Sequence, residues 1–250
     1  MSFEATQKQE EAIRKEIVES TSPISALLSS KEALGARWSS SPIALAKVAS
    51  LVSSGYTRVR LMRPDGNCLY RAFAVSLWES VRGAGSSCVP RLLALCDTMS
   101  EELAKVYPPM VFEDYADSFK EQLSAAPGGD EASLRALHDS TDDADCIIIF
   151  LRFATASAML KQRDLFEAFV PGGVGIEQFC NSEVMPMGRE AEEAHIVALA
   201  SAFEVHVSVA YMDNGEGDIV THKYGDEDAS IKVRLIYQPG HYDVLYKSDE

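Results

Sequence analysis

The fold is decided by one stretch of the sequence, Pro64-Asp-Gly-Asn-Cys68-Leu-Tyr-Arg-Ala-Phe73. Before it, the alternating run from Tyr56 to Met62 predicts a strand, and from Cys68 onward the apolar residues recur with helical spacing. A helix N-terminus presents unpaired N–H groups and a partial positive charge, which favour the thiolate form of a cysteine. The stretch therefore predicts a strand, a tight turn and a helix that begins at a nucleophile.

A second stretch, Gln238-Pro-Gly-His241-Tyr-Asp243-Val-Leu-Tyr246, supplies a base. Residues i and i+2 of a strand lie on the same face, roughly 6.5 to 7 Å apart, so Asp243 is expected beside His241. We expect its carboxylate to accept the Nδ1 proton of the ring and to leave Nε2 directed at the thiol of Cys68. Taken alone, this segment could equally be a hairpin corner that carries surface polar residues.

Asp65 has two interpretations. Asp-Gly is a common turn pair, so the side chain of Asp65 can serve only to shape the loop. Its backbone N–H, with that of Cys68, could also line an oxyanion site. Cys68 itself could be a small buried hydrophobe, as free cysteines usually are.

The remaining cysteines and histidines are weaker candidates. Apolar neighbours predict burial for Cys96, Cys146 and Cys180, whereas Cys88 lies in a Ser/Gly-rich loop. The other histidines lack a carboxylate two residues on and a preceding turn: His206 is expected on the polar side of a strand, His222 in a polar stretch and His195 within a helix.

Composition excludes several classes of function. The chain has 250 residues, with 38 acidic against 23 basic ones and a net charge of −15, which argues against a nucleic-acid partner. No secretory signal and no apolar run of about 18 residues is visible, so no membrane partner is expected. Five cysteines without a Cys-x-x-Cys pair argue against a disulfide framework and a zinc site. We expect a monomer in the cytoplasm, and also in the nucleus, without metal or cofactor.

The order of patterns indicates an α+β fold, because helical periods come first and period-two runs last. We expect a single domain over residues 1–250, with 1–40 as a helical N-terminal arm whose 22–41 portion is loosely packed. Ser41 is expected to cap a helix that ends at Gly55. Helices are predicted over 4–19, 42–54, from 68, and over 89–107, 112–123, 146–160 and 190–203, and strands over 56–62, 205–209, 231–237 and 244–246. Asp142 or Asp143 is expected to cap the helix at 146–160, and residues 213–217 form a predicted turn.

The segments 63–73 and 237–247 closely resemble the otubain branch of the ovarian-tumour cysteine proteases, which remove ubiquitin. Segments 179–187, 195–200 and 211–217 are also similar to otubain segments, so the resemblance covers roughly residues 8–248. It implies a papain-like α+β fold, with a mostly antiparallel sheet. It also implies that Cys68 is the nucleophile, His241 the general base and then acid, and Asp243 the orienting carboxylate. Asp65 matches a third position that the family assigns to the active site, which we interpret as support of the oxyanion loop.

By this resemblance the chain is a deubiquitinating cysteine protease that cleaves after the C-terminal glycine of ubiquitin, in polyubiquitin chains. Its implied partners are ubiquitin and polyubiquitin, with ubiquitin-like modifiers as further candidates. Two alternatives remain. The chain could be a ubiquitin-binding module whose histidine never aligns, or a papain-like hydrolase that acts on another modifier, peptide or amide.

Overall fold

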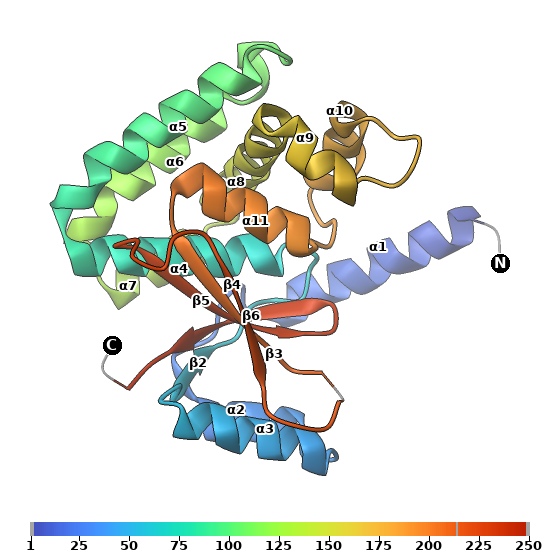
Figure 1. The fold of residues 1–250 in the computed structure, drawn as a ribbon, viewed down its shortest axis with the longest axis vertical. Helices are drawn as coiled ribbons and strands as arrows, with labels where there is room; N and C mark the ends of the chain where they lie inside the picture. The colour runs from blue at the N-terminus through green and yellow to red at the C-terminus, as the bar shows by residue number, and fades with distance from the viewer. Residues whose placement is uncertain (1–2, 214, 249–250) are drawn as a thin grey trace.

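A single mixed sheet organises the computed structural model, which describes residues 3–213 and 215–248 (Figure 1). Its strand order is β1-β2-β6-β5-β3-β4. Neighbouring strands are antiparallel except β3 and β5, which are parallel, so the predicted mostly antiparallel sheet is confirmed. The strands are β1 Leu28–Ser29, β2 Arg58–Arg60, β3 His206–Tyr211, β4 Val220–Tyr224, β5 Lys232–Gln238 and β6 His241–Tyr246.

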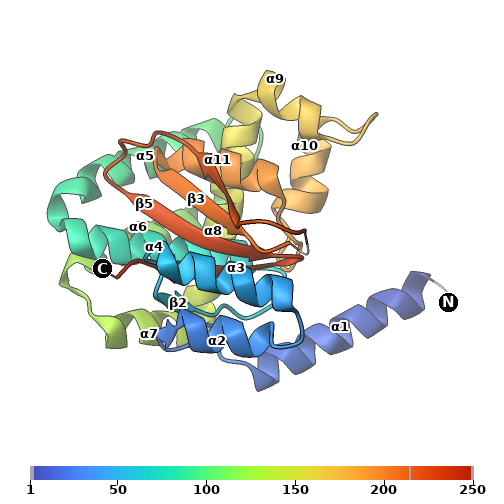
Figure 2. The same ribbon diagram turned by 60° about the horizontal axis from the view of Figure 1, so that its bottom comes forward.

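Helices cover both faces of this sheet. In Figures 1 and 2, α2 and α3 lie on one face and α4, α8 and α11 on the other. The α-helices are α1 Phe3–Ser20, α2 Ser30–Arg37, α3 Pro42–Ser53, α4 Cys68–Ala84, α5 Val89–Leu103, α6 Glu113–Ala125, α7 Glu131–Asp139, α8 Thr141–Lys161, α9 Arg163–Phe166, α10 Ile176–Phe179 and α11 Glu193–Phe203. Short 3₁₀ turns (86–88, 109–111, 126–128 and 167–169) and a π turn (180–184) connect them. The α+β fold class is confirmed.

Burial on both faces explains the composition of the central strands. Val233 and Leu235 of β5 pack with the α4 side, while Ile236 packs with the α2 and α3 side. A strand covered on both faces reads as a nearly continuous apolar run. For the same reason His206 of β3 is buried, although we had assigned it to a polar side of the strand. That prediction is wrong because β3 has no solvent-facing side there.

The start of α3 matches the sequence signals. The Ser41 side chain accepts a hydrogen bond from the Ala44 N–H at 3.3 Å, Pro42 occupies the first turn, and Gly55 takes φ +92° just after the helix. The start of α8 differs: its cap is Ser140, which accepts from Asp143 N–H, so neither predicted aspartate is the cap. The five helical residues 141–145 precede the predicted start because they are mostly polar and lack an apolar period.

The N-terminal segment divides into two parts. Helix α1 extends away from the other elements in both views, and its side chains Ile13 and Val18 are 50% and 43% exposed (Figures 1 and 2). Leu34 of α2 is fully buried in the cluster under the sheet. Residues 28–37 therefore form a strand and a helix of the body, and the predicted loose packing over 22–41 is wrong for them. Among residues 3–213 and 215–248, no helix has the length and apolar character needed to cross a bilayer.

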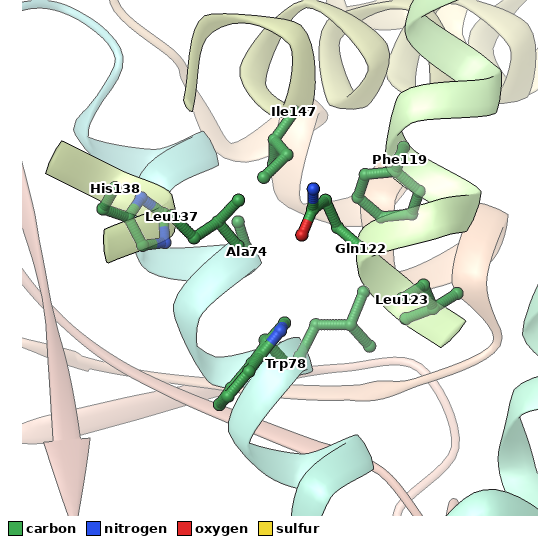
Figure 3. Close-up of a pocket in the computed structure, with 9 residues that line it drawn as sticks. Ala74, Trp78, Phe119, Gln122, Leu123, Leu137, His138 and Ile147 are labelled. Carbon is green, nitrogen blue, oxygen red and sulfur yellow. The ribbon is translucent and has the colours of Figure 1, made fainter. Parts of the chain in front are cut away.

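A small cavity lies where α4, α6, α7 and α8 meet (Figure 3). Its volume is about 20 Å³, and its lining includes Trp78, Leu137 and Gln122. A cavity of this size holds about one water molecule. Trp78 closes one side, and a Cβ placed on Gly129 would come within 2.4 Å of the indole ring. Every residue of α4 from Cys68 to Trp78 is buried, which holds the first part of the helix in place.

Candidate active site

Cys68 is the first residue of α4, as the sequence predicts. The chain leaves β2, turns at Gly66 with φ +79°, and enters the helix after Asn67. The first hydrogen bond at this helix end runs from the Arg71 N–H to the Asn67 carbonyl at 3.0 Å. The N–H groups ahead of it, including that of Cys68, point out of the helix end toward the thiol region. The Cys68 side chain is 7% exposed and its thiol is free.

His241 and Asp243 lie side by side on β6, but through the ring nitrogen opposite to the predicted one. His241 Nε2 lies 2.9 Å from Asp243 Oδ1. Nδ1 is buried and has no hydrogen-bond partner among the described residues, so the ring and the Cys68 thiol are close enough to interact electrostatically but are not joined by a hydrogen bond in this structure. The assignment of Nδ1 to the carboxylate was wrong because Nε2, at the far end of the ring, is the nitrogen that spans the distance to residue i+2.

The histidine is held in its charged form. Burial acts to lower the pKa of His241, but the hydrogen bond with Asp243 and the interaction with the Cys68 thiol outweigh it. Together they raise the pKa from 6.5 to about 9. At neutral pH His241 is thus an imidazolium, and a positive charge beside a thiol favours its activation as a nucleophile.

Asp243 is more firmly held than the sequence suggested. Its side chain is fully buried and accepts hydrogen bonds from the Met62 N–H at 2.7 Å, Arg37 at 2.7 Å and Gln238 at 3.1 Å, besides that of His241. Burial acts to raise the pKa of Asp243, but these bonds and the charges of His241 and Arg37 hold it below its ordinary value. Arg37 was missed, because it lies on α2 and nothing in the sequence links that helix to β6.

Asp65 shapes the turn and does not contact His241. Its carboxylate accepts from the Asn67 N–H at 3.0 Å and from Arg63 at 3.0 Å, and it also pairs with buried Arg71. Its own N–H donates to the Arg63 carbonyl at 3.0 Å. Of the two interpretations, the structure favours loop support by the side chain, because the N–H proposed for an oxyanion site is already engaged. The N–H of Cys68 remains for that role.

Asn67 ties the turn to a second segment of backbone. Its Oδ1 accepts a hydrogen bond from the Gly188 N–H at 2.8 Å. The two backbones approach so closely that a Cβ on Gly66 would lie 2.2 Å from the Gly188 carbonyl oxygen. Real Cβ contacts essentially never come below 3.0 Å. Glycine at 66 is therefore required both by its positive φ and by this contact.

Replacing Gly66 by alanine should displace Cys68 as well as destabilise the fold. We expect the G66A variant to lose about 2 kcal/mol or more, because a positive φ and a clash with backbone act together. Thermal unfolding and the alkylation rate of Cys68 measure the two effects. Gly83→Ala is the matched control, since its Cβ would meet nothing within 4 Å. Equal unfolding temperatures for the two variants would contradict this account of the turn.

An acidic and aromatic groove opens beside Cys68. Its volume is about 360 Å³. Its lining comprises Cys68, Glu190, Ala191, Glu192, Glu193, Tyr211, Tyr237, Gly240 and Tyr242. The tyrosine rings of 211 and 237 and those of 237 and 242 pack at 4.8 and 4.9 Å between centroids, and Tyr224 donates to Glu193 at 2.9 Å. The three carboxylates in this lining favour a positively charged partner over an anionic one.

The other candidate residues do not line this groove, although His222 packs on its Tyr211 at 4.5 Å between ring centroids. Cys96 and Cys180 are buried as expected, whereas Cys146 is only half-buried, because its place near the start of α8 leaves one side open. His222 is exposed on β4, and His195 caps α11 by accepting the Glu192 N–H at 3.0 Å. Within the described residues no cluster of three or more His, Cys, Asp or Glu side chains could hold a metal ion. Of the predicted turn 213–217, Asn214 falls outside the described residues.

Known proteins match most of this chain, both in sequence and in fold. The family model described as Peptidase C65 Otubain matches residues 12–247. The human protein named ubiquitin thioesterase OTUB1 is 34% identical over 194 residues, which cover 77% of this chain and 71% of that protein. The Arabidopsis thaliana ovarian tumor domain-containing deubiquitinating enzyme 1 is 32% identical over 262 residues, covering 96% of this chain and 83% of that protein.

Solved structures also match the fold of this chain. A complex titled h/ceOTUB1-ubiquitin aldehyde-UBC13~Ub superposes with a TM-score of 0.88 at 27% identity, covering 98% of each chain. A ceOTUB1 complex with ubiquitin aldehyde and UBC13~Ub gives 0.86 at 26% identity, covering 97% of this chain and 100% of that one. The likeness thus includes the sheet, the helices on both of its faces and the N-terminal segment.

Proposed function

The chain belongs to the otubain family of peptidases, and from that premise we propose that it is a deubiquitinating cysteine protease with ubiquitin as its partner. The single observation that carries the assignment of the site is the meeting of Cys68, His241 and Asp243 beside an open groove. The substrate is the peptide or isopeptide bond after the C-terminal glycine of ubiquitin, in polyubiquitin chains. The five free thiols support action in a reducing compartment, which we propose to be the cytoplasm and also the nucleus.

In the proposed reaction the Cys68 thiolate attacks the carbonyl carbon of the scissile bond. The oxyanion that forms is stabilised by the Cys68 N–H and the N-terminal end of α4. His241, as imidazolium, then donates its proton to the leaving lysine amine and a thioester remains on Cys68. Water attacks the thioester, His241 accepts its proton, and the ubiquitin carboxylate leaves. Asp243 keeps Nε2 engaged throughout, so Nδ1 performs both proton transfers.

The groove supports ubiquitin as the group on the acyl side. A tail that ends in two glycines suits the part of the groove beside Cys68, because it brings no side chains to a place where Glu190 lies close to Gly240: a Cβ on Gly240 would already be in van der Waals contact with the Glu190 carboxylate at 3.8 Å. The acidic residues beyond that point suit basic residues further up the tail. In this account specificity comes from the lack of side chains at the end of the tail and from the charge of the groove.

A panel of differently linked di-ubiquitins tests the function. We expect the wild-type chain to release mono-ubiquitin from at least one linkage, which would also identify its preferred substrate. Binding of di-ubiquitin without release would favour a ubiquitin-binding module. Cleavage of unrelated peptides or of a ubiquitin-like conjugate instead would favour a hydrolase of different specificity. An electrophilic ubiquitin C-terminal probe provides the independent check, because it labels Cys68 only in a competent site.

The pH profile of cleavage should fall on its alkaline side near pH 9. His241 must be protonated to donate to the leaving amine, and its pKa is about 9. Protonation of His241 also stabilises the fold. Because its pKa is raised from 6.5 to about 9, its contribution to the free energy of unfolding is complete below pH 6.5 and is lost as the pH rises through about 9. Rates of di-ubiquitin cleavage and unfolding temperatures measured between pH 6 and 10 provide the test. An alkaline limb below pH 7 would contradict the coupling described above.

A further inference from the structure

A buried arginine connects the two segments that form the site. Arg152 lies in the middle of α8 and is 0% exposed. In the sequence it only interrupts an apolar run. In the structure its guanidinium lies 4.3 Å from the centroid of the Tyr70 ring, one turn into α4 from the catalytic end. A buried charge is costly unless hydrogen bonds satisfy it, so its contacts indicate why it is there.

The guanidinium reaches both segments at once. Nη2 donates to the Gly66 carbonyl at 3.0 Å and to Asn67 Oδ1 at 2.7 Å, both in the turn that precedes Cys68. The same group also donates to the Arg189 carbonyl at 2.8 Å, while Nη1 donates to the Val184 carbonyl at 2.9 Å. One side chain thus holds the nucleophile turn and the segment 184–189 in a fixed relation.

The segment 184–189 leads directly into the wall of the groove. Glu190 and Glu192 follow it and line the groove beside Cys68. Asn67 adds a second link, because its Oδ1 accepts from the Gly188 N–H as well as from Arg152. Displacement of either segment would move the thiol relative to the carbonyl that the groove presents to it. A shift of about 1 Å in such a geometry can cost on the order of 100-fold in rate.

We propose that Arg152, acting through Asn67, is the positioning residue that sets the Cys68 turn against the groove wall. This inference rests on the proposed function for its substrate. It accounts for arginine rather than lysine at the site: a planar fork can donate in several directions at once, whereas an ammonium on a flexible stem cannot span the same acceptors. Helix α8 serves as the rigid base, since it is buried from Ile147 onward on most of its surface.

The test compares four variants with the wild type: R152K, N67A, N67D and F150L. Phe150→Leu is the control for stability. Phe150 is a buried residue of the same helix whose ring packs on that of Phe119 at 4.7 Å between centroids, and it is not one of the residues that join the Cys68 turn to segment 184–189. Asn67→Asp keeps an acceptor for both donors and adds a charge that Arg152 favours. Three measurements are made on each chain: unfolding temperature, kcat and KM for the di-ubiquitin that the wild type cleaves, and the pH profile of Cys68 alkylation by iodoacetamide, followed on the peptide that contains Cys68.

We expect R152K and N67A to lower kcat about 100-fold and to reduce Cys68 alkylation at neutral pH. N67D should recover most of the wild-type kcat and most of the Cys68 alkylation. F150L should change neither kcat nor alkylation, even where its unfolding temperature falls as far as that of R152K. Equal losses in R152K and F150L at matched unfolding temperature would overturn the proposal, as would N67D behaving like N67A. If the wild type cleaves no ubiquitin conjugate, the proposed function fails, but the alkylation profiles still decide whether Arg152 positions the thiol.

Discussion

Replacing Cys68 by alanine is expected to abolish cleavage while ubiquitin binding persists. The thiolate is the only group in the groove that can form the thioester, and loss of a nucleophile costs on the order of 10⁶-fold in a hydrolase of this kind. The side chain is small and 7% exposed, so its removal takes little from the surface that a ubiquitin tail would contact. Di-ubiquitin cleavage and the affinity for mono-ubiquitin are the two measurements.

Cys96→Ala is the matched control for that variant. Cys96 is also a buried free thiol, on α5, and burial raises its pKa to about 12, so it is unsuited to nucleophilic attack. The C96A variant should cleave at close to the wild-type rate. Residual cleavage by C68A, or the loss of ubiquitin binding along with activity, would remove Cys68 from the role assigned to it.

Replacing Asp243 by asparagine should lower kcat by roughly 10³- to 10⁴-fold without abolishing cleavage. Arg37 and Gln238 donate to Oδ2, whereas the Met62 N–H and His241 Nε2 face Oδ1. An amide oxygen that keeps the bonds from Arg37 and Gln238 places the amide NH₂ toward His241 and loses the bond from Met62. Nε2 must then act as an acceptor, so the ring proton moves to Nδ1 and the neutral histidine can no longer accept from the thiol. The pKa of His241 should also fall, because the hydrogen bond with Asp243 is the main cause of its elevation.

The pH profile makes this second prediction specific. In D243N the alkaline limb of cleavage should move to lower pH than in the wild type, in addition to the fall in rate. Asp130→Asn provides the control: Asp130 caps α7 far along the chain, and asparagine caps a helix equally well. Unchanged cleavage in D243N, or a fall in rate without movement of the limb, would show that Asp243 does not set the charge of the histidine.

Local signals in the sequence predicted the parts of the site that depend on neighbouring residues. The turn before Cys68, the start of α4 there, and the pairing of His241 with a carboxylate two residues on follow from glycine, period and strand geometry. The Ser41 cap follows from the same kind of rule. The catalytic roles of Cys68 and His241 stay predictions until the variants are measured, as does the assignment of a single domain.

Contacts between distant segments could not be predicted from the sequence. Arg37 reaches Asp243 only because α2 packs under β6, and Arg152 reaches the Cys68 turn only because α8 passes behind it. The apolar run around Arg152 indicates burial, but no local pattern in either helix indicates which distant acceptor the arginine reaches. Strand β4 was missed because its residues are exposed and polar, and α7 because it is short and lies between two turns.

The position of β6 in the sheet affects the order in which the protein can become active. This strand lies between β2 and β5, yet the ribosome makes it after both of them. Until it is inserted, no strand joins β2 to β5, and Cys68 has neither His241 nor Asp243, the base and the carboxylate that we propose for it, because both lie on β6. A chain whose synthesis stops before β6 contains Cys68 but lacks His241 and Asp243, so we expect it to have no hydrolase activity.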